Sequence, residues 1–323
     1  MQVSRQMQKE NLRYTRIDAV DGRALTKQER NSNVTALGRR LLTAGMIGCF
    51  LSHRKCWEIC IRNDKPHIVF EDDVMLVDGF CDQLNAVMKD LPEDWDVLLL
   101  GAFGCVHPSG VYGPFGSFKL FGLVGGGTRE TKVLPGGRVH IPWRPYGTHA
   151  YLISPRGARK LLSLAPRANF HVDNVAWGFR ELNLYAVHPL LAKQTHGDTT
   201  VGGLERSWVP GWFTQMDEYT GVSFEWAWNS PMVQLGGSRG VLITVGRLFS
   251  SAVIGLVLSL GHFAWTGSLI GVWAYALYFA TWTLILRILA FSFPEHAPLS
   301  EGVSPVGAES SGEVGHGSAR LLV

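Results

Sequence analysis

His67-Ile68-Val69-Phe70-Glu71-Asp72-Asp73-Val74 is the stretch that decides the fold, because a short apolar run ends there in three consecutive carboxylates. An apolar run that ends abruptly is typical of a strand buried on both faces. In an open α/β sheet, ligands bind beyond the carboxyl ends of the strands. The stretch therefore predicts a buried strand with an acidic site at its end. A solvated acidic turn is the alternative.

Two further apolar runs, 97–100 and 150–153, have the same strand-like character. Ser154-Pro155 predicts a helix start, with serine as N-cap and proline in the first turn, leading into residues 156–162. Strands that alternate with helices predict one α/β domain over residues 1–230, with a mostly parallel sheet. The glycine-rich stretch 101–147 is predicted to be a long loop, either a lid or plain surface.

The acidic triplet suits a divalent cation. Hard carboxylate oxygens bind Mg²⁺ or Mn²⁺, and these ions commonly take substrate phosphates as further ligands. The residue types thus predict a substrate with a diphosphate group.

The C-terminal region is predicted to enter a membrane. Residues 248–286 contain no Asp, Glu, Lys or Arg, and one membrane-spanning helix needs about 20 residues. We expect a helical hairpin within residues 231–291 that bends at 261–267, the alternative being a buried pair of core helices. Residues 292–323 are rich in Gly, Ser and Glu and are predicted to be a disordered tail.

The charge distribution bears on partners and on sidedness. The net charge of +3 is small and dispersed, which argues against a nucleic-acid partner. Arg239, Arg247 and Arg287 flank the apolar segment. A hairpin would place all three on one side of the membrane, and by the positive-inside tendency this side, with the N-terminal domain, is cytoplasmic.

Five blocks occur in the order and approximate spacing of a known family: 19–22 (Ala-Val-Asp-Gly), 48–53 (Gly-Cys-Phe-Leu-Ser-His), 70–74 (Phe-Glu-Asp-Asp-Val), 94–101 (Asp-Trp-Asp-Val-Leu-Leu-Leu-Gly) and 150–158 (Ala-Tyr-Leu-Ile-Ser-Pro-Arg-Gly-Ala). With them the chain resembles glycosyltransferase family 25. That family includes bacterial lipopolysaccharide glycosyltransferases and procollagen galactosyltransferases.

The resemblance implies a GT-A-like nucleotide-sugar-binding domain, a UDP-galactose or UDP-glucose donor, Mn²⁺ or Mg²⁺, and inverting transfer of a hexose to a glycan, lipid-linked or protein hydroxyl. It assigns the site residues as follows: Glu71 and Asp73 to the metal, Asp21, Ser52, His53 and Asp72 to the donor, and Asp173 to the acceptor or to the general base. Asp173 is also compatible with a helix N-cap.

Two departures from the family pattern keep a second hypothesis open. Met46 stands where the family usually has a glutamate, and Met1 follows the point where the family's first strand would lie. We therefore also consider a non-catalytic binding or adhesion module anchored to a membrane. A third possibility is a membrane protein whose soluble part regulates its spans.

Residues 44–63 are predicted to be helical, which places Cys49, His53, Cys56 and Cys60 along one face. Such a face permits zinc binding, but no second Cys or His pair is evident elsewhere, and core thiols beside a site-facing His53 are the preferred interpretation. His196 or Asp198 could complete a metal site from a later strand.

Overall fold

The computed structural model describes residues 2–103, 132–142, 145–194, 231–235, 241–290 and 320–322. Its helices are α1 (Gln2–Lys9), α2 (Lys27–Asn33), α3 (Gly38–Leu41), α4 (Ala44–Asn63), α5 (Phe80–Met88), α7 (Pro155–Leu164), α8 (Val172–Gly178), α10 (Val245–Thr266) and α11 (Ile270–Ala290). Its strands are β1 (Tyr14–Thr15), β2 (His67–Phe70), β3 (Val74–Leu76), β4 (Val97–Phe103), β5 (Lys132–Val133), β6 (Val139–Ile141), β7 (Tyr146–Ile153), β8 (Leu184–Val187), β9 (Ala192–Gln194), β10 (Pro231–Leu235), β11 (Val241–Thr244) and β12 (Arg320–Leu322). The predicted α/β class is confirmed.

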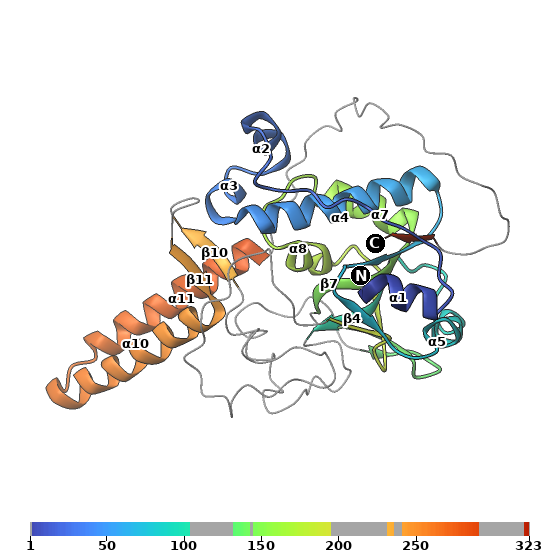
Figure 1. The fold of residues 1–323 in the computed structure, drawn as a ribbon. Coiled ribbons are helices and arrows are strands. Elements are labelled where there is room, and N and C mark those ends of the chain that lie inside the picture. Colours follow the sequence, from blue (N-terminus) through green and yellow to red (C-terminus); the bar gives the residue numbers. More distant parts are fainter. Residues whose placement is uncertain are drawn as a thin grey trace.

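The central sheet has the strand order β1-β12-β2-β7-β4-β8-β6-β5 (Figure 1). The three predicted strands β2, β4 and β7 are present, but β7 runs antiparallel to both of its neighbours. The β6–β8 and β5–β6 pairs are antiparallel too, so the prediction of a mostly parallel sheet is wrong. The error has a physical cause. A continuous apolar run reports that both faces of a strand are covered, and coverage does not determine strand direction.

Helices cover both faces of β2 and β7. Trp57 of α4 donates a hydrogen bond to Tyr151 of β7 on one face. Phe70 of β2 packs edge-on against Phe80 of α5, and its sheet partner is Ala150, the neighbour of Tyr151. Because side chains alternate along a strand, α5 covers the face opposite α4. The core therefore lies on both sides of the strand that carries Glu71.

The local helix signals act as predicted. Ser154 caps α7 by accepting a hydrogen bond from the Gly157 amide, and Pro155 occupies the first turn. Helix α4 spans Ala44–Asn63, the predicted range, and begins at the side-chain cap of Thr43. It ends where Asp64 adopts a left-handed conformation, with φ at 47°.

A close backbone approach fixes the loop before α4 against that helix. A Cβ on Gly22 would lie 1.9 Å from the Ala44 carbonyl oxygen, and one on Gly48 would lie 2.3 Å from the Val20 carbonyl oxygen. Neither position has room for a side chain. The two glycines thus bring the Ala-Val-Asp-Gly loop onto the N-terminal half of α4, next to Cys49.

Helices α10 and α11 form an antiparallel hairpin that extends away from the sheet (Figure 1). The turn begins at Gly267, in a left-handed conformation with φ at 67°, so the bend lies at the C-terminal end of the predicted 261–267 range. Apolar side chains on both helices face outward, and Trp265 is 90% exposed. Within the described residues, Gly246–Thr266 is the one helical segment long and apolar enough to cross a membrane.

Most of the segment predicted to be a disordered tail lies outside the described residues. Its described part, β12, pairs in parallel with β1 on one side and β2 on the other. Most of the predicted glycine-rich loop 101–147 also lies outside the described residues, but its described part includes β5 and β6 of the central sheet, so the loop prediction is wrong there.

Candidate functional site

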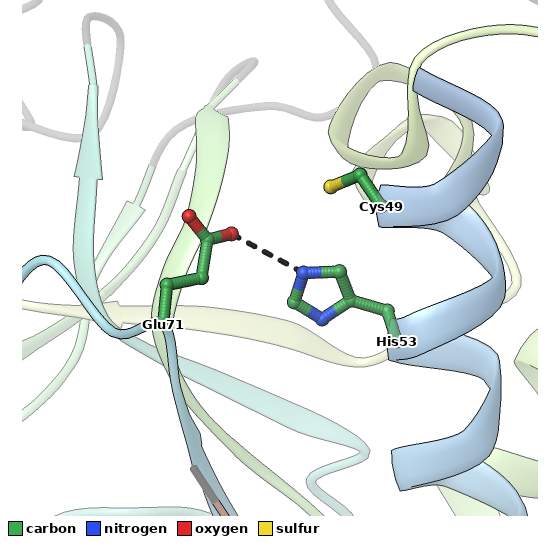
Figure 2. A group of neighbouring side chains, drawn as sticks. All are labelled: Cys49, His53 and Glu71. Carbon is green, nitrogen blue, oxygen red and sulfur yellow. Dashed lines mark hydrogen bonds and ion pairs between the residues drawn. The ribbon is translucent and has the colours of Figure 1, made fainter. Parts of the chain in front are cut away.

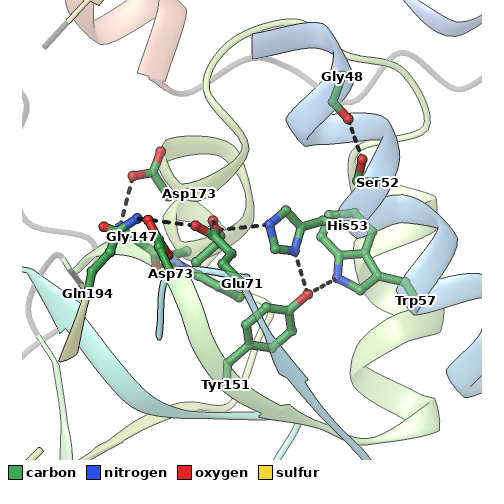
Figure 3. Close-up of polar contacts among 12 residues, drawn as sticks. Gly48, Ser52, His53, Trp57, Glu71, Asp73, Gly147, Tyr151, Asp173 and Gln194 are labelled. Carbon is green, nitrogen blue, oxygen red and sulfur yellow. Dashed lines mark hydrogen bonds and ion pairs between the residues drawn. The ribbon is translucent and has the colours of Figure 1, made fainter. Parts of the chain in front are cut away.

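Glu71 stands at the end of β2, where the sequence predicts the site. Its backbone amide donates to the His149 carbonyl across the sheet. Its Oε1 accepts a hydrogen bond from the Thr148 hydroxyl at 2.6 Å. The same oxygen pairs with His53 Nε2 at 3.2 Å (Figure 3). Burial alone would raise the pKa of Glu71. Contacts with His53, Thr148 and His149 outweigh burial and lower its pKa, so Glu71 is ionised at neutral pH.

Two buried aromatic residues fix His53 on the side of its Nδ1 atom. Its Nδ1 lies 3.0 Å from the Tyr151 hydroxyl, which also accepts a hydrogen bond from Trp57 Nε1 at 3.0 Å. With the Trp57 proton directed at the Tyr151 oxygen, the Tyr151 hydroxyl can donate to Nδ1. His53 Nε2 then carries the proton that meets Glu71. The chain Trp57–Tyr151–His53 therefore aims one imidazole nitrogen at the carboxylate.

Asp73 approaches from the β3 side of the acidic triplet. The Gln194 amide of β9 donates to Asp73 Oδ2 at 2.6 Å and lies 3.4 Å from Glu71 Oε2, so one donor serves both carboxylates. Burial and the negative charge of Glu71 raise the pKa of Asp73 to about 7. Glu71 and Asp73 share one neutral donor, and Asp73 loses its proton only near neutral pH. A cation bound between the two carboxylates would therefore be strongly favoured.

Asp173 joins the group from α8. It lies in the first turn of that helix, but His171 occupies the N-cap position. Asp173 Oδ2 accepts from the Gly147 amide at 2.9 Å, and Trp177 of the same helix donates to the Gly147 carbonyl. Burial raises the pKa of the Cys49 thiol, and Glu71, Asp173 and Asp73 raise it further by their charge. Figure 3 shows the carboxylates of Glu71, Asp73 and Asp173 near one another on the side of α4 that carries His53.

The structure brings His53, Glu71, Asp73 and Asp173 together as the sequence predicts. Asp72, between two inward-facing acids, is exposed. Asp21 is exposed as well, and its Oδ1 accepts from the Arg23 amide within the turn. The donor-binding assignments of Asp21 and Asp72 stay predictions.

Ser52 has a structural position that the sequence did not reveal. Its hydroxyl accepts a hydrogen bond from the Val20 amide at 2.9 Å and donates to the Gly48 carbonyl at 2.7 Å. The hydroxyl thereby ties the loop at residues 19–22 to α4. Its direct contact with a donor stays a prediction.

Sequence reasoning missed Thr148, Tyr151 and Gln194 as partners of the site. Tyr151 lies on the strand predicted at 150–153, whereas Thr148 belongs to the part of β7 that precedes the predicted range. Only the pairing of β7 with β2 places them near the site. Gln194 reaches the triplet because β9 pairs with β3 in the register Val74 with Gln194. His196 and Asp198, considered as ligands from this direction, lie outside the described residues.

The four-residue helical face divides into two parts. Cys56 and Cys60 are buried in the core, where burial raises the pKa of each thiol to about 12. Cys49 and His53 instead share a neighbourhood with Glu71. The prediction of core thiols holds for Cys56 and Cys60, and Cys49 belongs to the site.

A second acidic motif is structural. Asp96 is fully buried, and its carboxylate accepts from Arg156 Nε at 2.7 Å, from Lys160 Nζ at 2.5 Å and from the Asn183 amide at 2.9 Å. Burial alone would raise the pKa of Asp96, but the Lys160, Arg156 and Asn183 contacts lower it. Asp96 thus joins α7 to the start of β8.

Comparison with known proteins supports the family resemblance of these residues. The model of glycosyltransferase family 25, described as an LPS biosynthesis protein, matches residues 1–106, which include α4, β2 and the acidic triplet. Together with the curated relatives described next, this match identifies the chain as a member of glycosyltransferase family 25. The family resemblance of the sequence motifs is thereby confirmed.

Three curated relatives show how the family match extends. The chain is 31% identical over 264 residues to the human inactive glycosyltransferase 25 family member 3, covering 69% of this chain and 39% of the relative. It is 30% identical over 262 residues to the rat probable inactive member 3, covering 69% and 41%. It is 30% identical over 213 residues to procollagen galactosyltransferase 1-B of Xenopus laevis, covering 56% and 31%. The chain thus spans well under half the length of these relatives.

Proposed function

We propose that this chain transfers a hexose, galactose or glucose, from a UDP-sugar to a hydroxyl of a glycan, lipid-linked or protein acceptor. One observation carries the proposal: Glu71 and Asp73 of the β2–β3 turn and Asp173 of α8 bring three carboxylates together beside His53 in a family 25 chain (Figure 3). The galactosyltransferase name of the Xenopus relative supports galactose, and its procollagen title supports a protein acceptor. A GT-A-like nucleotide-binding mode is part of the proposal.

The residues fit a hard divalent cation such as Mn²⁺ or Mg²⁺ at Glu71 and Asp73. Both carboxylates lie within reach of the single Gln194 amide, and the charge of Glu71 raises the pKa of Asp73. A cation between them would cancel that repulsion. When bound, it supplies charge neutralisation for the diphosphate leaving group.

The chain's own residues then position the reactants and move one proton. Asp173, held by the Gly147 and Asn174 amides, accepts the acceptor's hydroxyl proton. The acceptor oxygen forms a bond to the anomeric carbon from the face opposite the diphosphate, and the bond from that carbon to the diphosphate oxygen breaks. UDP leaves and the anomeric configuration inverts. His53 orients Glu71 through its Nε2 contact.

We also propose that the α10–α11 hairpin attaches the chain to a membrane. The outward apolar side chains of both helices have few partners among the described residues, and only 6% of the most apolar window of α10 is buried. A lipid phase would cover such a surface. We expect the catalytic side to be cytoplasmic on the charge argument given above.

A non-catalytic binding module is the second candidate. The human and rat relatives are named inactive and probable inactive. Moreover, the chain's own donors from His53, Thr148 and Gln194 already serve both Glu71 oxygens. Such self-satisfaction would suit a scaffold that no longer needs a cation.

Donor hydrolysis by the detergent-purified full chain decides between these candidates. With Mn²⁺ and UDP-galactose or UDP-glucose, we expect turnover that Asp73→Ala abolishes. Asp82→Ala, an exposed acid on α5, is the matched control and should leave turnover unchanged. Equal activity in Asp73→Ala would exclude its assigned role.

Calorimetry with UDP and Mn²⁺ identifies the scaffold. An enzyme should bind UDP more tightly when Mn²⁺ is present. A module without the proposed site should show no metal-dependent nucleotide binding.

A further inference from the structure

Cys49, His53 and Glu71 form a compact donor set on the α4 side of the acidic triplet. Their Sγ, imidazole nitrogen and carboxylate oxygen all lie within 4.8 Å of one another (Figure 2). His53 is buried, whereas Cys49 and Glu71 are partly exposed. The set comes from two elements, one turn of α4 and the end of β2. One sulfur, one nitrogen and one oxygen thus face a common point.

The spacing is close to what a tetrahedral ion requires. With zinc bonds of about 2.0 Å to oxygen, 2.1 Å to nitrogen and 2.3 Å to sulfur, tetrahedral ligand atoms lie about 3.3 to 3.6 Å apart. His53 Nε2 and Glu71 Oε1 are already 3.2 Å apart. The Cys49 Sγ lies within 4.8 Å of the other two ligand atoms, so the thiol has to move closer by no more than about 1.5 Å.

The surrounding contacts are those that hold metal ligands in place. A ligating histidine normally uses its other ring nitrogen in a hydrogen bond, and His53 Nδ1 meets the buried Tyr151 hydroxyl. A ligating carboxylate is in turn hydrogen-bonded, and Thr148 donates to Glu71 Oε1. Both outer partners lie on β7, so the central strand of the sheet supports the donor set.

We propose that Cys49, His53 and Glu71 bind a zinc-class transition-metal ion. Thiolate and imidazole ligands favour zinc over Mg²⁺ or Mn²⁺, which prefer oxygen. Three protein ligands leave the fourth position of a tetrahedron open to water or another ligand, as in sites where the metal stays exchangeable. Metal binding would release the Cys49 thiol proton to solvent, because the thiolate is the ligand. The His53 proton would move from Nε2 to Nδ1, where the Tyr151 hydroxyl oxygen can accept it, so that Nε2 is free to bind the ion.

This site differs from the proposed Mn²⁺ position. Glu71 Oε1 faces His53 and Thr148, whereas Oε2 faces Gln194 and, through it, Asp73. The zinc-class ion would use the first side and the donor-linked cation the second. The inference therefore does not depend on glycosyl transfer, and a chain with no transferase activity would still bind zinc.

Cobalt binding to the untagged, detergent-purified full chain tests the proposal. We expect one Co²⁺ per chain, displaceable by Zn²⁺, with the near-ultraviolet charge-transfer absorption of a thiolate ligand. Cys49→Ser should remove that absorption and weaken Zn²⁺ binding by at least about tenfold, since losing even an outer-shell partner costs ten- to a hundredfold.

Cys81→Ser is the matched control, because Cys81 is a partly exposed thiol on α5 that donates to the Glu10 carbonyl. It should keep the absorption and the affinity. Absence of thiolate absorption in the wild-type chain, or its persistence in Cys49→Ser, would overturn the proposal.

X-ray absorption of the zinc-loaded wild-type chain gives a test that needs no variant. One sulfur at about 2.3 Å with nitrogen and oxygen at about 2.0 to 2.1 Å would support the site. A shell of oxygen and nitrogen alone would exclude it. All these measurements are made without nucleotide or Mn²⁺, so their failure is distinct from a failure of the donor-hydrolysis assay.

Discussion

The two acidic motifs next to strands, 94–96 and 71–73, differ in how the protein neutralises their charge. Asp96, in the Asp-Trp-Asp motif, is neutralised by Arg156 and Lys160, and its pKa is lowered. Asp73, at the end of the acidic triplet, accepts from the neutral Gln194 amide, and burial together with the charge of Glu71 raises its pKa to about 7. A carboxylate whose charge the protein has already neutralised holds the fold together. One whose charge the protein leaves largely uncompensated is available to a ligand.

The largest expected effect is a loss of turnover at the candidate site. Asp173→Asn should lower the turnover number about a hundred- to ten-thousand-fold, because the amide cannot take the acceptor proton. The Asn side chain keeps one oxygen and can still accept from only one of the Gly147 and Asn174 amides, so we expect a modest loss of stability of about 1 kcal/mol. Steady-state kinetics with a sugar acceptor, alongside a melting curve, measures both. Full turnover in this variant would remove Asp173 from the proton transfer.

Asp96→Asn should instead affect stability. It leaves Arg156 and Lys160 beside a buried neutral group, and breaking a buried pair costs about 3 kcal/mol. The pKa of Asp96 is lower in the folded state than in the unfolded state. Its contribution to the free energy of unfolding is therefore fully present above the unfolded-state pKa and is lost as the pH falls through the folded-state pKa. Denaturant unfolding at pH 7 and pH 3 should show the variant and the wild type converging at low pH. An equal difference at both values would contradict the ion-pair account.

In the metal-free chain, Asp73→Asn should raise the free energy of unfolding, whereas Asp96→Asn lowers it. The pKa of Asp73 is raised in the folded state, so ionising Asp73 lowers the free energy of unfolding progressively as the pH rises from about 4 to about 7. Above about pH 7 this loss stays constant. We expect the variant to be more stable than the wild type by about 1 to 2 kcal/mol at pH 8, allowing for partial solvent screening. At pH 4 the two should unfold alike. A destabilised variant at pH 8 would mean that Asp73 supports the fold as Asp96 does.

Lys160→Met should give the smallest effect. Lys160 is one of two cations on Asp96, and a third of its side chain is exposed. Arg156 and the Asn183 amide remain in place, so we expect a loss of about 1 kcal/mol in unfolding free energy. A loss as large as that of Asp96→Asn would show that Lys160 alone carries the pair. Denaturant unfolding at low salt measures the difference.

Local patterns predicted more of this chain than long-range ones. The helix at Ala44–Asn63, the cap at Ser154 and the strands β2, β4 and β7 all follow from signals a few residues long. The direction of β7 does not, because it depends on how the chain returns from β4. The separation of Cys49 from Cys56 and Cys60 does not either, since one helix face can meet both the site and the core.

The residues therefore determined by themselves where charge would gather, at Glu71 and Asp73, since an apolar strand that ends in acids is a local pattern. They also indicated the apolar helical hairpin, although only the fold shows that its side chains face outward. Only the tertiary structure decided which partners face those acids. Thr148 and Gln194 reach Glu71 and Asp73 through strand pairing across 77 to 123 residues of chain, and Tyr151 acts on Glu71 only through His53. Pairing register is a property of the whole sheet.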